Sequence, residues 1–160
     1  MSNSDEFVIN NGVLEDYHGQ GGNVIIPDEV KKIGYASFMY CEGLTSVVIH
    51  NGVKSIGQNA FLGCTALKSI VIPGSVYEID CGTFIGCTAL TSVTIESGVT
   101  RIREHAFHDC ESLTSIMIPE SVADIETAAF ANCPNLTIRA YAGSLAEKYA
   151  KANGILFSSF

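Results

Sequence analysis

The 160-residue chain has no tryptophan, few charged residues and no long apolar segment. Only nine residues are Lys or Arg, against 17 Asp or Glu, so the formal net charge is −8. The nine basic residues are scattered and form no patch that would neutralise phosphates, which argues against nucleic acid as a partner. No apolar run approaches the ~20 residues of a membrane-spanning helix, and the first six residues do not resemble a secretory leader.

The composition is that of a chain that buries most of itself. Hydrophobic residues make up 47% of the sequence and charged residues only 16%, which excludes a disordered tail. A chain of this length forms one compact domain or a short repeat array. The sequence therefore predicts a single structural domain.

Residues of one type recur every 23 positions, which is the mark of a repeat protein. The columns are Phe38, Phe61, Phe84, Phe107 and Phe130; Cys41, Cys64, Cys87, Cys110 and Cys133; Leu44, Leu67, Leu90, Leu113 and Leu136; Val30, Val53, Val76, Val99 and Val122; and Ile33, Ile56, Ile79, Ile102 and Ile125. The register holds without an insertion over residues 24–138. We therefore expect five 23-residue repeats, an N-terminal tail and cap in residues 1–23, and a C-terminal cap in residues 139–160.

One repeat indicates a short strand followed by turns. Val47 and Ile49 alternate with Val48, which is the period of a strand, and turn-forming residues follow at positions 50–52. The spacing of four from Ile56 to Ala60 and those of three from Phe61 to Cys64 and on to Leu67 suit short helical or 3₁₀ turns on the opposite side. A single repeat would leave one of its apolar faces exposed, whereas stacked repeats bury both. The prediction is therefore a right-handed α/β solenoid with a parallel sheet.

Both ends of the array have the signals of caps. Two alternating segments flank Asn11-Gly12, a strong hairpin signal. At the other end, Ser144 and Glu147 form a capping box for a helix that runs to about Asn153 and stops at Gly154. Residues 155–157 then read as a last short strand.

The residues from Leu44 to Cys64 fit the pattern L-T-S-V-V-I-x-x-G-V-x-S-I-G-x-x-A-F-x-x-C, which resembles the BspA-like leucine-rich repeats. The resemblance covers about five repeats of ~23 residues. It implies a leucine-rich repeat fold with the parallel sheet on the concave face. It also implies a bacterial protein of the cell surface or secreted fraction that mediates adhesion to host matrix proteins or to other cells, without a catalytic role or a cofactor.

The six cysteines contain no metal-binding motif. No two are closer than six residues, whereas zinc sites use C-x₂₋₄-C pairs. Neighbouring members of the Cys column point the same way, which is poor disulfide geometry. We expect a buried column of free thiols and a partly exposed Cys81, which favours a reducing or anaerobic setting.

Catalytic groups are not assembled in the sequence. His105 and His108 lie beside core positions and have no third ligand, so we expect solvent-facing or half-buried histidines. A row of serines has no adjacent base and is better interpreted as hydroxyls bonding along the sheet edge. The glycines at 19–22 precede a strand, whereas a phosphate-binding loop follows one. The prediction is a non-enzymatic protein with no metal site.

The outward side of the strands is the candidate binding surface. An apolar stripe there marks either a protein-binding surface or strand propensity alone. The candidate residues are Ile25, Val48, Val71, Thr94 and Met117, flanked by Ser46, Ser69, Ser92 and Ser115 and by His50 and Glu96.

Two functional hypotheses stay open. The first is a protein-binding module for adhesion at a bacterial surface, and the second is an intracellular scaffold of the same fold, favoured by the free thiols and the missing leader. The partner is a protein of unknown identity in both. We take a monomer as the default oligomeric state, although Tyr141, Phe157 and Phe160 offer a surface for association.

Overall fold

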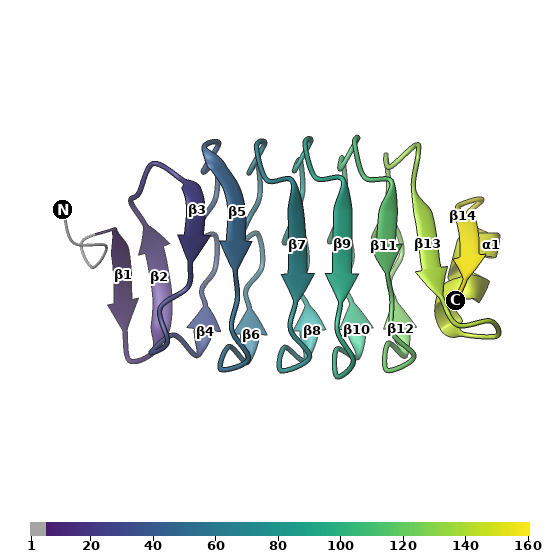
Figure 1. Cartoon of the computed structure of the whole chain (residues 1–160), viewed down its shortest axis with the longest axis horizontal. Helices are drawn as coiled ribbons and strands as arrows, with labels where there is room; N and C mark the ends of the chain where they lie inside the picture. The colour runs from purple at the N-terminus through teal and green to yellow at the C-terminus, as the bar shows by residue number, and fades with distance from the viewer. Residues whose placement is uncertain (1–5) are drawn as a thin grey trace.

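The computed structural model describes residues 6–160 and shows a solenoid whose strands lie on two sides and, apart from the first hairpin, pair in parallel (Figure 1). The N-terminal tail that was predicted to lack a leader lies partly outside these residues. The elements are β1 (Phe7–Asn10), β2 (Val13–Tyr17), β3 (Gly22–Ile25), β4 (Lys32–Ile33), β5 (Leu44–Val48), β6 (Ser55–Ile56), β7 (Ser69–Ile72), β8 (Glu78–Ile79), β9 (Ser92–Ile95), β10 (Arg101–Ile102), β11 (Ser115–Met117), β12 (Asp124–Ile125), β13 (Thr137–Ala140), α1 (Leu145–Ala152) and β14 (Leu156–Ser159).

The longer strands form one side of the solenoid, which we call the long-strand sheet. It consists of the ladder β7-β9-β11-β13-β14 and, beside it, the pair β3-β5. The two-residue strands β4, β6, β8, β10 and β12 form a second ladder, the short-strand sheet, which β1 and β2 extend at its N-terminal end. Ser69 and Ile70 of one turn pair with Ser92 and Val93 of the next, so the 23-residue period is the register of the stack.

The second side has the short 3₁₀-type turns that the spacing indicates, together with two-residue strands that it does not indicate. Within residues 6–160 the one helix is α1, and each repeat instead has a two-residue strand followed by single turns with i→i+3 hydrogen bonds, such as Leu62 N–H to the Asn59 carbonyl (3.1 Å). These turns do not continue into a helix because each contains left-handed residues, which break right-handed helical geometry.

Two positions of every repeat have a left-handed backbone, with φ between 52° and 71°. Only glycine adopts this conformation freely, and asparagine and aspartate tolerate it. The two columns are Ala36, Asn59, Gly82, His105 and Ala128, and Tyr40, Gly63, Gly86, Asp109 and Asn132. The non-glycine residues there carry local strain, which the geometry of the turn imposes.

Replacing one strained alanine by glycine is expected to stabilise the fold. Ala128→Gly relieves a left-handed φ of 59°, which should raise the free energy of unfolding by about 0.5–1 kcal/mol. Ala66→Gly is the matched control, because Ala66 is half-buried and has a negative φ. This substitution should lower the free energy of unfolding by about 0.5–1 kcal/mol. Urea unfolding of the two variants measures both changes. A lower free energy of unfolding in both variants would show that Ala128 is not strained.

The core is a stack of aromatic rings. Phe38, Phe61, Phe84, Phe107 and Phe130 are at most 4% exposed, and successive ring centroids lie 5.0–5.3 Å apart, close to parallel. Tyr17 and Phe7 continue the stack at the N-terminal end and Tyr149 at the C-terminal end. The caps therefore cover the hydrophobic core with rings of their own.

The Cys column packs beside the rings. Cys64, Cys87 and Cys110 are buried, and the end members Cys41 and Cys133 are half-buried. The thiols of Cys64, Cys87, Cys110 and Cys133 each donate to the Phe carbonyl of the preceding repeat at 3.1–3.2 Å. Burial raises the pKa of Cys64 and raises that of Cys87 to about 12. At the C-terminal end, the hydrogen bond with Cys110 instead lowers the pKa of Cys133. The column thus hydrogen-bonds adjacent repeats to each other through its thiols.

The caps form as predicted. β1 and β2 make an antiparallel hairpin with Asn11 and Gly12 at positive φ, as a two-residue I′-type turn requires. β2 then pairs in parallel with β4, placing Leu14 in the register of the Ile column, so the hairpin supplies part of a repeat. In the other cap, Ser144 Oγ accepts the Glu147 N–H, and Gly154 follows the helix with φ of 65°.

Candidate functional site

The outward row, which we define as Ile25, Val48, Val71, Thr94 and Met117, lies on the solvent side of the long-strand sheet. Ile25 is 70% exposed, Val48 57% and Val71 49%, while both strand neighbours of each point into the core. Strand alternation explains this, since successive side chains point to opposite faces. Thr94 is partly exposed and polar, and Met117 is 36% exposed, so the row is apolar at four of its five positions. A row of solvent-facing apolar residues on a sheet face is the kind of surface that marks interaction sites.

The flanking serines do not form the expected hydrogen-bonded row. Of the four, Ser46 alone has a side-chain hydrogen bond in the described chain, from its Oγ to Asn23 Oδ1 at 2.8 Å. The hydroxyls that bond from repeat to repeat belong to the preceding position, where Thr91 Oγ donates to the Lys68 carbonyl and Thr114 Oγ to that of Thr91. Ser69 and Ser92 are exposed beside the outward row, with hydroxyls available to a ligand.

His50 and Glu96, on the other flank, are engaged by backbone groups. His50 Nδ1 accepts the Gly52 N–H and Nε2 lies 3.0 Å from the Pro27 carbonyl, so the neutral ring that donates from Nε2 satisfies both contacts. Glu96 Oε2 accepts the Gly74 N–H at 3.2 Å. The neighbouring Pro73 is buried, so this column is not uniformly outward. Both side chains hold turns at the rim of the surface, and a binding role for them stays a prediction.

The outward row continues beyond the residues predicted from the sequence. Met117 pairs with Arg139, because β13 follows β11 after 22 residues and not 23. Arg139 lies over the Phe160 ring at 5.6 Å, and Tyr141 packs edge-on against the same ring at 5.3 Å. Arginine and aromatic side chains are the residue types enriched at the centres of protein interfaces. The row therefore ends in a cluster of Arg139, Tyr141 and Phe160.

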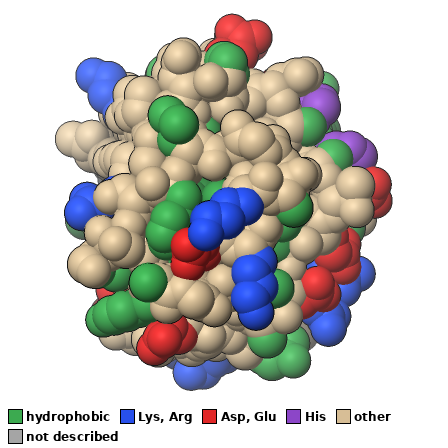
Figure 2. Space-filling view, turned by 90° about the vertical axis from the view of Figure 1, so that its right-hand side faces the viewer, with side chains coloured by type: hydrophobic (Ala, Val, Ile, Leu, Met, Phe, Trp, Pro, Cys, Tyr) green, Lys and Arg blue, Asp and Glu red, His purple; other side chains and the backbone are tan. Residues whose placement is uncertain are grey.

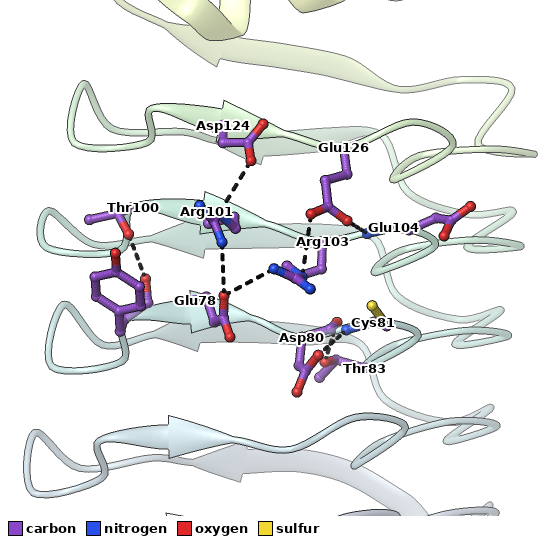
Figure 3. A network of polar contacts seen from close by, with 11 residues as sticks. Glu78, Asp80, Cys81, Thr83, Thr100, Arg101, Arg103, Glu104, Asp124 and Glu126 are labelled. Atoms are coloured by element: carbon purple, nitrogen blue, oxygen red, sulfur yellow. Dashed lines mark hydrogen bonds and ion pairs between the residues drawn. The ribbon is translucent and has the colours of Figure 1, made fainter.

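The charged residues with the most contacts lie on the other side of the molecule, over the short-strand sheet (Figure 3). Arg101 contacts Glu78 and Asp124 at 3.9 and 3.2 Å, and Arg103 contacts Glu78 and Glu126 at 3.8 and 3.4 Å. Glu104 N–H also donates to Glu126. These contacts connect β8, β10 and β12. They occupy both guanidinium groups, and exposed pairs of this kind contribute little stability each.

The histidines and Cys81 do not assemble a catalytic or metal centre. His105 and His108 contact each other edge-on at 5.1 Å, and each faces a neighbouring carboxylate, Glu104 or Asp109. Among residues 6–160 no three His, Cys, Asp or Glu side chains converge as a metal site would require. Cys81 is half-exposed, as predicted, and its amide donates to Asp80 at 2.7 Å (Figure 3). No helix in the same residues has the length and apolarity to cross a membrane.

The stacked parallel turns, the buried Phe and Cys columns and the exposed strand face define a repeat protein of the leucine-rich class. The chain belongs to the BspA-type leucine-rich repeat family, whose model matches six copies over residues 16–137. The recurring Phe, Cys, Leu, Val and Ile positions define five 23-residue repeats. The family match starts earlier, at residue 16 in β2, and counts six. Leucine-rich repeat proteins of this type are generally non-catalytic, and the fold is consistent with a protein-interaction module.

Solved bacterial structures share this fold. A leucine-rich repeat protein of T. pallidum is 31% identical, with a TM-score of 0.76, over 79% of this chain and 62% of that one. A leucine-rich cell surface protein of Faecalibacterium prausnitzii is 36% identical, with a TM-score of 0.78, over 86% of this chain and 37% of that one. A leucine-rich repeat protein of Bacteroides ovatus is 34% identical, with a TM-score of 0.71, over 86% and 37%. This chain thus spans 37–62% of their lengths. No curated protein matches it.

Proposed function

We propose that the chain is a non-catalytic recognition module that binds another protein through the outward row and its C-terminal cluster. The observation that carries this proposal is the continuous line from Ile25 to Met117, which ends in Arg139, Tyr141 and Phe160. The side chains of the outward row lie outside the core, so folding does not require them to be large and apolar. An extended segment of a partner could lie along the row and use the free hydroxyls of Ser69 and Ser92.

We place this module at a bacterial cell surface, where it serves adhesion. The support is the likeness to the F. prausnitzii protein, which is described as a cell surface protein. The acidic net charge of −8 opposes binding to anionic glycans and favours a neutral or basic protein.

Panning a phage-displayed library of linear peptides on the immobilised chain tests the binding surface. We expect peptides to be enriched, and Val71→Arg, in the middle of the row, to weaken their binding at least about tenfold by placing a charge in an apolar contact. Thr65→Arg is the control, because Thr65 is exposed but lies outside the row. Failure to enrich any peptide, or equal binding by both variants, would contradict the proposal. Retention of purified matrix proteins by the same immobilised chain tests the adhesive role separately.

A further inference from the structure

The two ends of the solenoid carry opposite charge. Residues 6–30 contain five acidic side chains and no Lys or Arg, a net charge of −5. Residues 139–160 contain Arg139, Lys148 and Lys151 against Glu147, a net charge of +2. Figure 2, which views the C-terminal end, shows basic side chains near the middle of that face, with acidic and hydrophobic ones beside them. Lys31 and Lys32 follow directly, and Lys31 Nζ donates to the Asp28 carbonyl at 3.1 Å, so residues 6–32 together carry a net charge of −3.

Each end also leaves a strand edge without a partner. Within residues 6–160, β3 pairs only with β5, and β14 pairs only with β13. The two edge strands run in the same direction (Figure 1). Phe160 N–H bonds back to Ala140, so alternation directs the N–H groups of Phe157 and Ser159 away from β13. A strand laid against either edge therefore meets unsatisfied backbone donors and acceptors, the condition for strand addition.

Apolar groups accompany both edges. A groove of about 620 Å³ lies beside β3 and is lined by Phe7 and Ile9 of β1 and by Ile25, with Asp28 and Glu29 at its margin. At the opposite end, Leu156 of β14 is 68% exposed and Phe160 52%. One end thus offers an apolar groove with an acidic margin, and the other offers exposed apolar side chains with basic neighbours.

We propose that the chain associates head to tail with a second copy of itself, the β14 and α1 end of one copy docking on the β1 and β3 end of the next. In this arrangement β14 lies parallel to β3, so the long-strand sheet runs on from copy to copy. Pairing of two like ends would instead bring two acidic ends or two basic ends together and is opposed by repulsion. The proposal goes beyond recognition through the outward row: the contact covers the two ends of the row, at Ile25 and Phe160, and leaves Val48, Val71, Thr94 and Met117 open.

Sedimentation of the full chain over a range of concentrations tests the association. A head-to-tail contact uses two different surfaces and does not close after two copies. The average mass should therefore rise above 17.1 kDa with concentration at low salt, and return toward that value in roughly 0.5 M salt, where the charges are screened. A mass that stays at 17.1 kDa at low salt, or one that saturates at a closed dimer, would overturn the proposal.

Two charge reversals identify the ends. Glu29→Lys alters the acidic end and Lys148→Glu the basic end; both side chains are exposed and neither has an ion-pair partner within residues 6–160. Each should weaken self-association about tenfold. An equimolar mixture should form dimers and nothing larger, because the basic end of the first variant and the acidic end of the second are unaltered.

Matched variants separate this contact from general effects of charge and edge. Glu111→Lys changes the net charge as Glu29→Lys does, but Glu111 is an exposed residue of a middle repeat. This variant should therefore associate like the unaltered chain. Ser159→Pro removes one outward N–H of β14 without a charge change and should weaken association about tenfold. Circular dichroism verifies that each variant is folded. A mixture that stays monomeric, or folded end variants that associate normally, would refute the head-to-tail contact.

Discussion

Phe84→Ala is expected to lower the free energy of unfolding by about 3–5 kcal/mol, because it opens a cavity in the middle of the ring stack. Phe84 is fully buried, and its ring centroid lies 5.3 Å from that of Phe61 and 5.2 Å from that of Phe107. Truncation removes both stacking contacts and the apolar burial between two repeats. Since small domains are stable by only about 5–15 kcal/mol, the variant should lose a large part of its stability.

The position in the array should decide the size of this effect. Each repeat contacts only its neighbours, so a break in the centre separates two halves that must each remain folded. Phe7 is half-buried at the end of the stack and contacts one ring, that of Tyr17. Phe7→Ala should therefore cost roughly 1–2 kcal/mol. Urea unfolding of both variants measures the difference; equal losses at the two positions would show that the ring stack does not act as a continuous core.

The long-strand sheet and the caps could be predicted because their signals are local and repeated. Alternation between Val47 and Val48 determines which side chain enters the core, and the structure places Val47 inside and Val48 at 57% exposure. The hairpin at Asn11-Gly12 and the helix after Ser144 follow from turn and capping chemistry. In these segments one residue type at one position selects one backbone geometry.

The short-strand sheet could not be predicted because its strands are two residues long. A segment such as Ser55–Ile56 is too short to show alternation, and its pairing with Lys32–Ile33 exists only in the stack. The left-handed columns were equally hidden. They hold alanine, tyrosine and histidine as well as glycine, because the stacked turns impose the geometry on whichever residue stands there.

The apolar part of the candidate site, up to Met117, could be predicted from the sequence. Its C-terminal end, which begins at Arg139, could not. Counting by 23 from Met117 leads to Ala140, whereas the register places Arg139 there, because the last step is one residue shorter. The lost residue lies after Leu136, because Leu136 follows Leu113 by 23 residues whereas Ile138 follows Ile116 by 22. No pattern in the sequence indicates whether a partner covers the row, since β-branched residues also serve strand propensity.

The thiols should differ in alkylation rate by at least about 1000-fold when the protein is folded. The thiolate is the reactive form, and burial raises the pKa of Cys87 to about 12, so near neutral pH its thiolate fraction falls by about three powers of ten. Cys64 and Cys110 are buried in the same column, whereas Cys81 is half-exposed. Cys41 and Cys133 are exposed to a similar degree as Cys81, and the hydrogen bond with Cys110 lowers the pKa of Cys133. Iodoacetamide labelling followed by mass spectrometry should therefore modify Cys41, Cys81 and Cys133 first and leave Cys64, Cys87 and Cys110 until the protein unfolds.

The control and the denatured state complete the test. Cys81→Ser should remove one of the three fast-labelling thiols without changing the three slow ones, because the Cys81 side chain lies outside the buried column. In denaturant without reductant all six cysteines should react, since their pKa values return to the ordinary value. Fast labelling of Cys87 in the folded protein would contradict the buried column. A deficit in denaturant that reductant restores would instead show paired thiols, and would favour an oxidising location over a reducing one.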